Sequence, residues 1–194
     1  MSERILIGSA THVCKAYSFD RWLAAVRALT YPNLDVLVVD NSPTSENADR
    51  MRATGLTVIW QEGADQIHAM LRITRSMEVI RQYFLEGSWD RWFNLEADVI
   101  PPPDVIERLL ELGHDADWIS HSYPPHGCTI PNQQGVGCSI FSRKLAEGFD
   151  FSHAGDNAPD GWLWQQVLPQ VHKYPTTELY GRFVVQHLDP PEVA

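Results

Sequence analysis

The sequence of 194 residues has few cysteines and no long hydrophobic run. Its three cysteines form an odd, sparse set, which favours a reducing compartment over a disulfide framework. No apolar run approaches the roughly 18 residues of a membrane-spanning helix. The opening residues, MSERILIG, lack the pattern of a secretory signal peptide. We therefore expect a cytoplasmic chain without a membrane span.

Positive charge is also scarce. The sequence has 15 Lys and Arg residues against 25 Asp and Glu residues, so its formal net charge is −10 and its pI is near 5.1. Because clustered Lys and Arg side chains hold phosphate backbones, this balance argues against a general nucleic-acid binder. It still permits a phosphorylated small molecule that is held through a metal ion.

A zinc site is one alternative that the cysteines and histidines raise. The segment HSYPPHGC (residues 121–128) contains one cysteine, Cys128, while Cys14 and Cys138 lie further away. These residues include zinc-ligand types, but their spacing lacks the paired CxxC or HxxxH signature. A structural zinc site therefore stays open as an alternative without a sequence signature.

Strand-like and helix-like segments alternate along the chain. Apolar runs that end in turn residues predict strands, and apolar residues at helical spacing predict helices. We expect strands in the segments RILIGSA, LDVLVVD, LTVIW, RWFNL, DWISHS, GVGCSIFS and RFVVQH. We expect helices at 19–29, 64–85, 103–112 and 160–168, and a loop at 123–134. This order predicts one α/β domain over residues 1–194, a three-layer α/β/α sandwich with a mainly parallel central sheet.

Polar and acidic residues follow several of these predicted strands. The first strand ends near Ala10 and Thr11, and the second ends at Asp40. The fourth ends at the sequence EAD, which contains Glu96 and Asp98 and precedes three prolines. In open α/β sheets, ligands bind where the carboxyl ends of the strands meet. Two neighbouring carboxylates repel each other unless a cation joins them, and Mg²⁺ or Mn²⁺ suits such oxygen ligands.

The order of these segments resembles GT-A fold glycosyltransferases, particularly the large inverting family 2 group. TYPNLDVLVVDNSPT is similar to the nucleotide pocket of that family, and NLEADVIPPPDVIERLL falls where the family carries its D-x-D motif. GVGCSIFSRKLAEGFDF, APDGWLWQQV and VVQH are similar to later family segments. The resemblance covers nearly the whole chain. The sequence departs from the pattern with Glu96 as the first acid of D-x-D and with Pro159 before Asp160.

This resemblance implies metal-dependent transfer of a sugar to an acceptor hydroxyl, with inversion. The implied donor is a UDP- or GDP-sugar, the cofactor is Mn²⁺ or Mg²⁺, and the acceptor is not identified. The resemblance implies these nucleotide-binding residues: Ala10, Thr11, Asp40 and Glu96. It implies Asp98 and His187 as metal ligands. Asp160 is implied as the general base that takes the proton of the acceptor hydroxyl.

Each of these roles has a structural alternative. Asp40 and Asp160 also fit helix-capping positions, and a strand-end histidine such as His187 also fits a structural role. Two other functions stay open as well. One is a nucleotidyltransferase on a related fold, for which the segment GSATHVCK supplies only one glycine and one lysine. The other is a non-catalytic nucleotide-sugar binding module, which the departures at Glu96 and Pro159 would fit.

Overall fold

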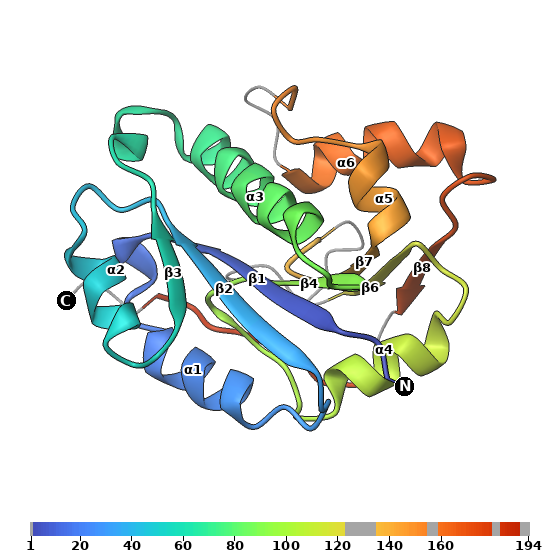
Figure 1. The fold of residues 1–194 in the computed structure, drawn as a ribbon, viewed down its shortest axis with the longest axis horizontal. Coiled ribbons are helices and arrows are strands. Elements are labelled where there is room, and N and C mark those ends of the chain that lie inside the picture. The colour runs from blue at the N-terminus through green and yellow to red at the C-terminus, as the bar shows by residue number, and fades with distance from the viewer. Residues whose placement is uncertain (1, 123–134, 155–158, 180–182, 191–194) are drawn as a thin grey trace.

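The computed structural model describes residues 2–122, 135–154, 159–179 and 183–190. Its middle layer is a seven-stranded sheet with the strand order β3-β2-β1-β4-β7-β6-β8 (Figure 1). The strands are β1 (Ile5–Thr11), β2 (Leu34–Asp40), β3 (Thr57–Trp60), β4 (Arg91–Leu95), β6 (Trp118–His121), β7 (Cys138–Ser142) and β8 (Thr176–Leu179). Neighbouring strands are parallel except where β7 pairs with β4 and with β6. The mainly parallel sheet predicted from the sequence is confirmed.

Helices cover both faces of this sheet (Figure 1). One side carries α1 (Phe19–Arg27), α2 (Glu46–Arg52) and α4 (Val105–Leu112), and the other carries α3 (Ala69–Glu86), α5 (Arg143–Gly148) and α6 (Pro159–Val167). Short 3-10 helices lie at η1 (Val13–Lys15), η2 (Ala64–Gln66) and η3 (Leu168–Gln170). Two apolar clusters, one on each side of the sheet, hold the layers together. The predicted three-layer sandwich is therefore confirmed.

The packing of α3 against β1 shows how the sequence sets the layer spacing. Met77, Ile80 and Phe84 are buried and recur at helical spacing, so they form one apolar face of α3. Below them, Gly8 lies in the middle of β1. A Cβ atom added to Gly8 would lie 2.3 Å from Cγ2 of Ile80 and 2.5 Å from Nε1 of Trp92. The glycine thus allows α3 to approach the strand closely.

Some predicted boundaries differ from the observed ones. The segment 64–85 was predicted as one helix, but it is divided into η2 and α3. His68 adopts a non-helical conformation between them, and its Nδ1 atom accepts a hydrogen bond of 3.4 Å from the backbone N–H of Met70. Of the predicted strand at 182–187, the structure describes residues 183–187, and among these only β9 (Gln186–His187) is a strand; it pairs with β5 (Val99–Ile100) in a separate two-stranded sheet. The predicted loop at 123–134 lies outside the described residues.

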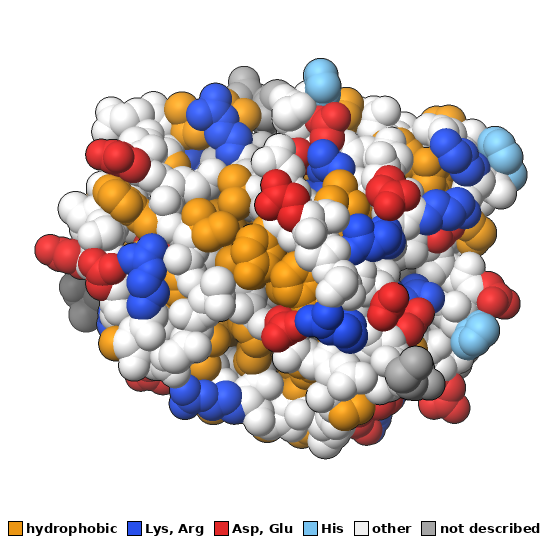
Figure 2. Space-filling view, in the orientation of Figure 1, with side chains coloured by type: hydrophobic (Ala, Val, Ile, Leu, Met, Phe, Trp, Pro, Cys, Tyr) orange, Lys and Arg blue, Asp and Glu red, His pale blue; other side chains and the backbone are white. Residues whose placement is uncertain are grey.

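The surface adds two observations. Among the helices of the described ranges, none combines the length and the apolarity that crossing a bilayer requires. Figure 2 shows one face of the molecule, on which Lys and Arg side chains are interspersed with Asp and Glu side chains. Hydrophobic side chains gather near the middle of this face. The described residues on this face therefore form no continuous basic area of the kind that holds a phosphate backbone.

Candidate functional site

A cavity lies at the carboxyl ends of the parallel strands. It has a volume of about 390 Å³. Its walls come from the ends of β1, β4 and β9, from α3, and from the first residue of α6. The strand register brings these ends together, because Thr11 on β1 lies beside Asp40 on β2 and β4 pairs with the other side of β1. The residues on its wall include Ala10, Thr11, Lys15, Asn41, Met70, Arg72, Ile73, Glu96, Asp98, Pro159 and His187. This is the sheet edge at which ligands of open α/β folds bind.

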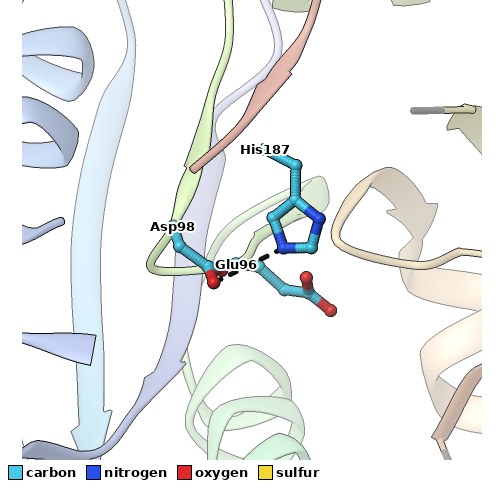
Figure 3. A group of neighbouring side chains, drawn as sticks. All are labelled: Glu96, Asp98 and His187. Atoms are coloured by element: carbon cyan, nitrogen blue, oxygen red, sulfur yellow. Dashed lines mark ion pairs between the residues drawn. The ribbon is translucent and has the colours of Figure 1, made fainter. Parts of the chain in front are cut away.

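Three candidate ligand side chains meet on one wall of this cavity. Glu96 and Asp98 follow β4, and His187 comes from β9. The small sheet brings them together, because His187 is paired with Val99 and the backbone N–H of Leu188 donates to the Asp98 carbonyl at 2.8 Å. One ligand atom from each of the three side chains lies within 4.8 Å of the other two. Figure 3 shows the imidazole of His187 turned towards the Asp98 carboxylate, with Glu96 alongside.

The Oδ2 atom of Asp98 is the meeting point of several groups. Nζ of Lys15 donates to it, the hydroxyl of Tyr17 donates to it at 3.1 Å, and Nε2 of His187 lies 3.4 Å away. Asp98 is only 1% exposed, so burial opposes ionisation of its carboxyl group. The hydrogen bonds from His187 and Lys15 outweigh this effect, and the pKa of Asp98 lies well below its ordinary value. The side chain is therefore a carboxylate at neutral pH.

The same contacts explain the protonation state of the Tyr17 hydroxyl. Burial, followed by the nearby negative charge of Asp98, raises the pKa of the Tyr17 hydroxyl well above its ordinary value. The hydroxyl therefore stays protonated, and it also donates to the carbonyl oxygen of Leu188 at 2.9 Å. Tyr17 thus links the region after β1 to both chain segments that carry the candidate ligands.

The donor set of Glu96, Asp98 and His187 fits a divalent cation. Two carboxylates supply hard oxygen ligands, and an imidazole supplies a nitrogen that suits Mn²⁺ more than Ca²⁺. The mutual separation of the ligand atoms, at most 4.8 Å, allows one ion to contact all three. The pairing of β5 with β9 also fixes the backbone of His187 and of the residue that follows Asp98.

Asp40 occupies a different position from the other predicted site residues. Its side chain is fully buried, and it is not on the wall of the cavity. Its Oδ1 atom accepts hydrogen bonds from the Ser42 hydroxyl at 2.6 Å and from Nδ2 of Asn47 at 3.0 Å. Its Oδ2 atom is buried and has no hydrogen-bond partner among the described residues. The next residue, Asn41, does line the cavity.

The remaining predicted residues lie around the same cavity. Ala10 and Thr11 are on its wall, at the end of β1. Asp160 is in the first turn of α6, where its Oδ1 atom accepts from the backbone N–H of Gly161 at 3.1 Å. The preceding residue, Pro159, lies on the cavity wall. Asp160 is therefore adjacent to the cavity but outside the group formed by Glu96, Asp98 and His187.

Two residues at the centre of the site were not predicted from the sequence. Lys15 and Tyr17 contact Asp98, yet neither stands in a recognisable motif. Both follow β1 within a few residues, at the sheet edge where ligands collect. That position is the one sequence feature that could have pointed to them.

The zinc alternative finds no support among the described residues. Cys138 is buried in β7, and Cys14 is exposed at the cavity. Burial raises the pKa of the Cys138 thiol well above its ordinary value, which disfavours the thiolate that zinc requires. The cluster of metal-ligating side chains found in the described ranges contains no cysteine. Cys128 lies outside those ranges.

No protein-family model and no curated protein sequence matches the chain. Several solved structures do share its fold. TarS 1-349 from S. aureus in complex with UDP matches with a TM-score of 0.65 and 11% identity, over 94% of this chain and 59% of that chain. Mannosyltransferase PcManGT from Pyrobaculum calidifontis, in complex with GDP-Man and Mn²⁺, matches with a TM-score of 0.63 and 14% identity, over 93% and 56% of the respective chains.

A third structure extends the comparison. Glucosyl-3-phosphoglycerate synthase from Mycobacterium tuberculosis, in complex with Mn²⁺, UDP and phosphoglyceric acid, matches with a TM-score of 0.66 and 12% identity. That match covers 98% of this chain and 72% of the synthase chain. Identities this low show the fold, and the chain has the GT-A-type fold of nucleotide-sugar transferases. The chain spans 59% of the length of TarS 1-349.

Proposed function

We propose that the chain is a glycosyltransferase that moves a sugar from a nucleotide-diphosphate donor to an acceptor hydroxyl with the help of a divalent cation. The observation that carries this proposal is the convergence of Glu96, Asp98 and His187 on one cavity at the carboxyl edge of a GT-A-type sheet. The fold neighbours support it, because their structures contain UDP or GDP-Man, two of them together with Mn²⁺.

The residues on the wall of the cavity have separate roles in this proposal. Asp98 and His187 hold Mn²⁺ or Mg²⁺, and Glu96 faces the ribose or a water molecule on the ion. Ala10 and Thr11 contact the nucleotide from the end of β1. A cation held there would neutralise the negative charge that develops on the departing diphosphate in the transition state.

Asp40 is a nucleotide ligand of another kind in this scheme. The next residue, Asn41, lines the cavity, and the buried Oδ2 atom of Asp40 lacks a protein partner among the described residues. A donor N–H of the nucleotide base is the partner that the proposal assigns to this oxygen. Because Asp40 is not on the cavity wall, this contact requires the oxygen to become accessible from the cavity.

Asp160 is the proposed general base. Its carboxylate takes the proton of the acceptor hydroxyl while the hydroxyl oxygen forms a bond to the anomeric carbon. The bond from that carbon to the diphosphate breaks on the opposite face, so the configuration inverts and no covalent intermediate with the protein forms. Its neighbour Pro159 lines the cavity, which puts the first turn of α6 at the edge of the proposed donor site.

Analysis of the reaction products tests the proposal against its two alternatives. The protein is incubated with UDP- and GDP-sugars, with Mn²⁺ or with EDTA, and the release of nucleoside diphosphate is measured. We expect release that depends on Mn²⁺, either by transfer or by slow donor hydrolysis. A nucleotidyltransferase would instead form pyrophosphate from a nucleoside triphosphate and a sugar phosphate. Binding of the nucleotide sugar without either product would identify a binding module and contradict the enzyme proposal.

The role of Asp98 has its own test. We expect UDP or GDP to bind more tightly with Mn²⁺ than with EDTA, and we expect Asp98→Ala to abolish this gain, as measured by titration calorimetry. Asp115→Ala is the matched control, because that carboxylate is exposed and lies outside the cavity. Equal nucleotide affinity of the unaltered protein with Mn²⁺ and with EDTA would contradict metal-dependent binding.

A further inference from the structure

Lys15 is a charged residue of the cavity to which the proposed reaction assigns no role. It is the last residue of η1, immediately after β1, and its ammonium group donates to Oδ2 of Asp98. The Lys15 side chain is 33% exposed and lines the cavity, whereas Asp98 is almost completely buried. The ammonium thus approaches the buried carboxylate from the cavity side.

The position of this ammonium conflicts with a cation on Asp98. A divalent ion binds a carboxylate oxygen at about 2.0–2.6 Å, closer than an ammonium group. The Tyr17 hydroxyl and Nε2 of His187 already lie beside the same Oδ2 atom. A metal ion on this oxygen would lie against the Lys15 ammonium, and two positive charges at this separation repel strongly inside a protein. Lys15 and the metal ion therefore exclude each other at Oδ2.

We propose that Lys15 is an internal counter-ion that competes with the divalent cation for Asp98, and that the donor diphosphate receives the Lys15 ammonium when the cation enters. This inference rests on the proposed function and adds a specific residue to it. The lysine has a flexible four-carbon stem and lines the same cavity as the candidate metal ligands, so its ammonium can turn towards a diphosphate bound there.

If Lys15 moves from Asp98 to the diphosphate in this way, the affinities for the metal ion and for the nucleotide are coupled. When Mn²⁺ binds alone, it displaces the Lys15 ammonium and the ion pair between Lys15 and Asp98 is lost, so Mn²⁺ binding is weak. When a nucleoside diphosphate is present, the displaced ammonium pairs with a phosphate oxygen, so each ligand strengthens the binding of the other. The two effects are equal in size, because coupling between two binding sites is reciprocal.

Calorimetric titration of Mn²⁺ tests the competition. In the absence of nucleotide, we expect Lys15→Met to bind Mn²⁺ more tightly than the unaltered protein, by about tenfold, a common size for coupling between sites. The gain in Mn²⁺ affinity on adding UDP or GDP should shrink in this variant. Lys173→Met is the control, since it makes the same charge change at an exposed lysine outside the cavity. Lys15→Arg keeps the positive charge and should retain the weak binding of Mn²⁺ alone.

A second measurement follows the chemical reactivity of Lys15. It uses the unaltered protein, so its result does not depend on whether a variant folds. Acetic anhydride modifies accessible amines, and peptide mass spectrometry reports the extent at each lysine. We expect Lys15 to react slowly in EDTA, faster with saturating Mn²⁺, and slowly again with Mn²⁺ together with UDP or GDP. Lys173 should react equally in all three conditions.

The outcomes separate this inference from the proposed function. Tighter Mn²⁺ binding by Lys15→Met, or release of Lys15 to acetylation by Mn²⁺, supports the competition. If Mn²⁺ binds the unaltered protein and Lys15→Met equally, and leaves the acetylation of Lys15 unchanged, the competition is refuted while the metal site stands. If no Mn²⁺ binds with or without nucleotide, both the metal-dependent function and this inference are overturned.

Discussion

A buried carboxylate needs partners for its oxygens, and Asp98 obtains them from residues that are distant in the sequence. Lys15 is 83 residues away and Tyr17 is 81 residues away. A substitution at Asp98 therefore affects packing between segments as well as ligand binding. For this reason the melting temperature of Asp98→Ala must be recorded together with its nucleotide affinity.

Asp160 supports a prediction that separates catalysis from packing. A general base acts on the acceptor, so Asp160→Asn should leave donor and metal affinity nearly unchanged. Turnover should fall by roughly 10²–10⁴, the usual contribution of general base catalysis. The substitution keeps the size of the side chain and can still accept from the Gly161 N–H, so the melting temperature should be retained. Full transfer activity in the variant would reject Asp160 as the base and remove the main support for inversion.

Asp40 supports a second prediction at this scale, and here two effects must be measured together. Asp40→Ala removes the acceptor for Ser42 and Asn47, so the free energy of unfolding should fall by about 1–3 kcal/mol. Loss of the proposed contact with the base should also weaken nucleotide binding, by about 1.5–3 kcal/mol for a hydrogen bond to a charged group.

Denaturant unfolding and calorimetry of the same sample give these two quantities. Ser45→Ala is a suitable control, because its hydroxyl bonds to the exposed Asp49 in the same region. A destabilised variant whose nucleotide affinity is unchanged would show that Asp40 only holds the turn that leads into α2.

The candidate ligands predicted from the sequence share one property. Glu96 and Asp98 end a strongly apolar run before three prolines, and His187 follows another apolar run, so each stands where a pattern breaks. Lys15 and Tyr17 stand in a short polar segment without periodicity, and their partner lies on another strand. Side-chain pairs of this kind follow from the fold, so the sequence of the segment alone does not predict them.

At the scale of elements, the two residues of an ion pair within α3, Glu78 and Arg81, connect this helix to α5 and to the segment that follows it. Glu78 accepts from Arg81 at 2.8 and 2.9 Å and from the backbone N–H of Phe151 at 2.9 Å. Arg81 in turn donates to the carbonyl oxygen of Ala146 at 2.7 Å. Burial raises the pKa of Glu78, but the hydrogen bonds from Arg81, Phe151 and Gln82 outweigh it, so the pKa of Glu78 is lower than its ordinary value.

Because the pKa of Glu78 is lowered, the contribution of this carboxylate to the free energy of unfolding depends on pH in a predictable direction. A carboxyl group whose pKa is lower in the folded chain stabilises the fold above its unfolded pKa, about 4.3 for Glu. That contribution is lost as the pH falls through the folded pKa. Glu78→Gln should therefore lower the free energy of unfolding by about 1–3 kcal/mol at pH 7, and the difference should shrink below about pH 4.

Urea unfolding between pH 3 and pH 7 measures the effect of Glu78→Gln. Glu86→Gln serves as its control, because Glu86 is an exposed residue at the end of the same helix. A difference between Glu78→Gln and the unaltered protein that stays constant over this pH range would show that the contacts of Glu78 do not depend on its charge.

The elements also show why sequence patterns predict some features and not others. The strands ending at Thr11, Asp40 and Leu95 were predicted because apolar runs and turn residues bound them. The antiparallel direction of β7 was not predicted, because the residue pattern of a buried strand is the same in either direction. The helix α5 was also not predicted, and α2 was considered only as a helix that Asp40 would cap. They have six and seven residues, too few for a clear helical period.

The whole molecule should respond to its ligands through mass action. UDP or GDP with Mn²⁺, at about 100 times the dissociation constant, adds about 2.7 kcal/mol to the free energy of unfolding. For a domain of this size, that corresponds to a rise in melting temperature of roughly 5–10 °C. Differential scanning fluorimetry measures the shift, with uridine and guanosine as controls that lack the diphosphate. An equal shift with the nucleosides would show that the diphosphate and the cation contribute nothing.

The pairing of β5 with β9 has a consequence for the order in which the chain acquires its properties during synthesis. Tyr17 and Leu188, which are joined by the hydrogen bond from the Tyr17 hydroxyl to the Leu188 carbonyl, are separated by 171 residues. A ribosome that adds about 5–20 residues per second delivers the second of them roughly ten to thirty seconds after the first. The nascent chain therefore carries Glu96 and Asp98 for several seconds before His187 exists. Lys15 is synthesised before Asp98, so in the proposed scheme the incomplete ligand set would have its counter-ion throughout that interval and would attract metal ions weakly.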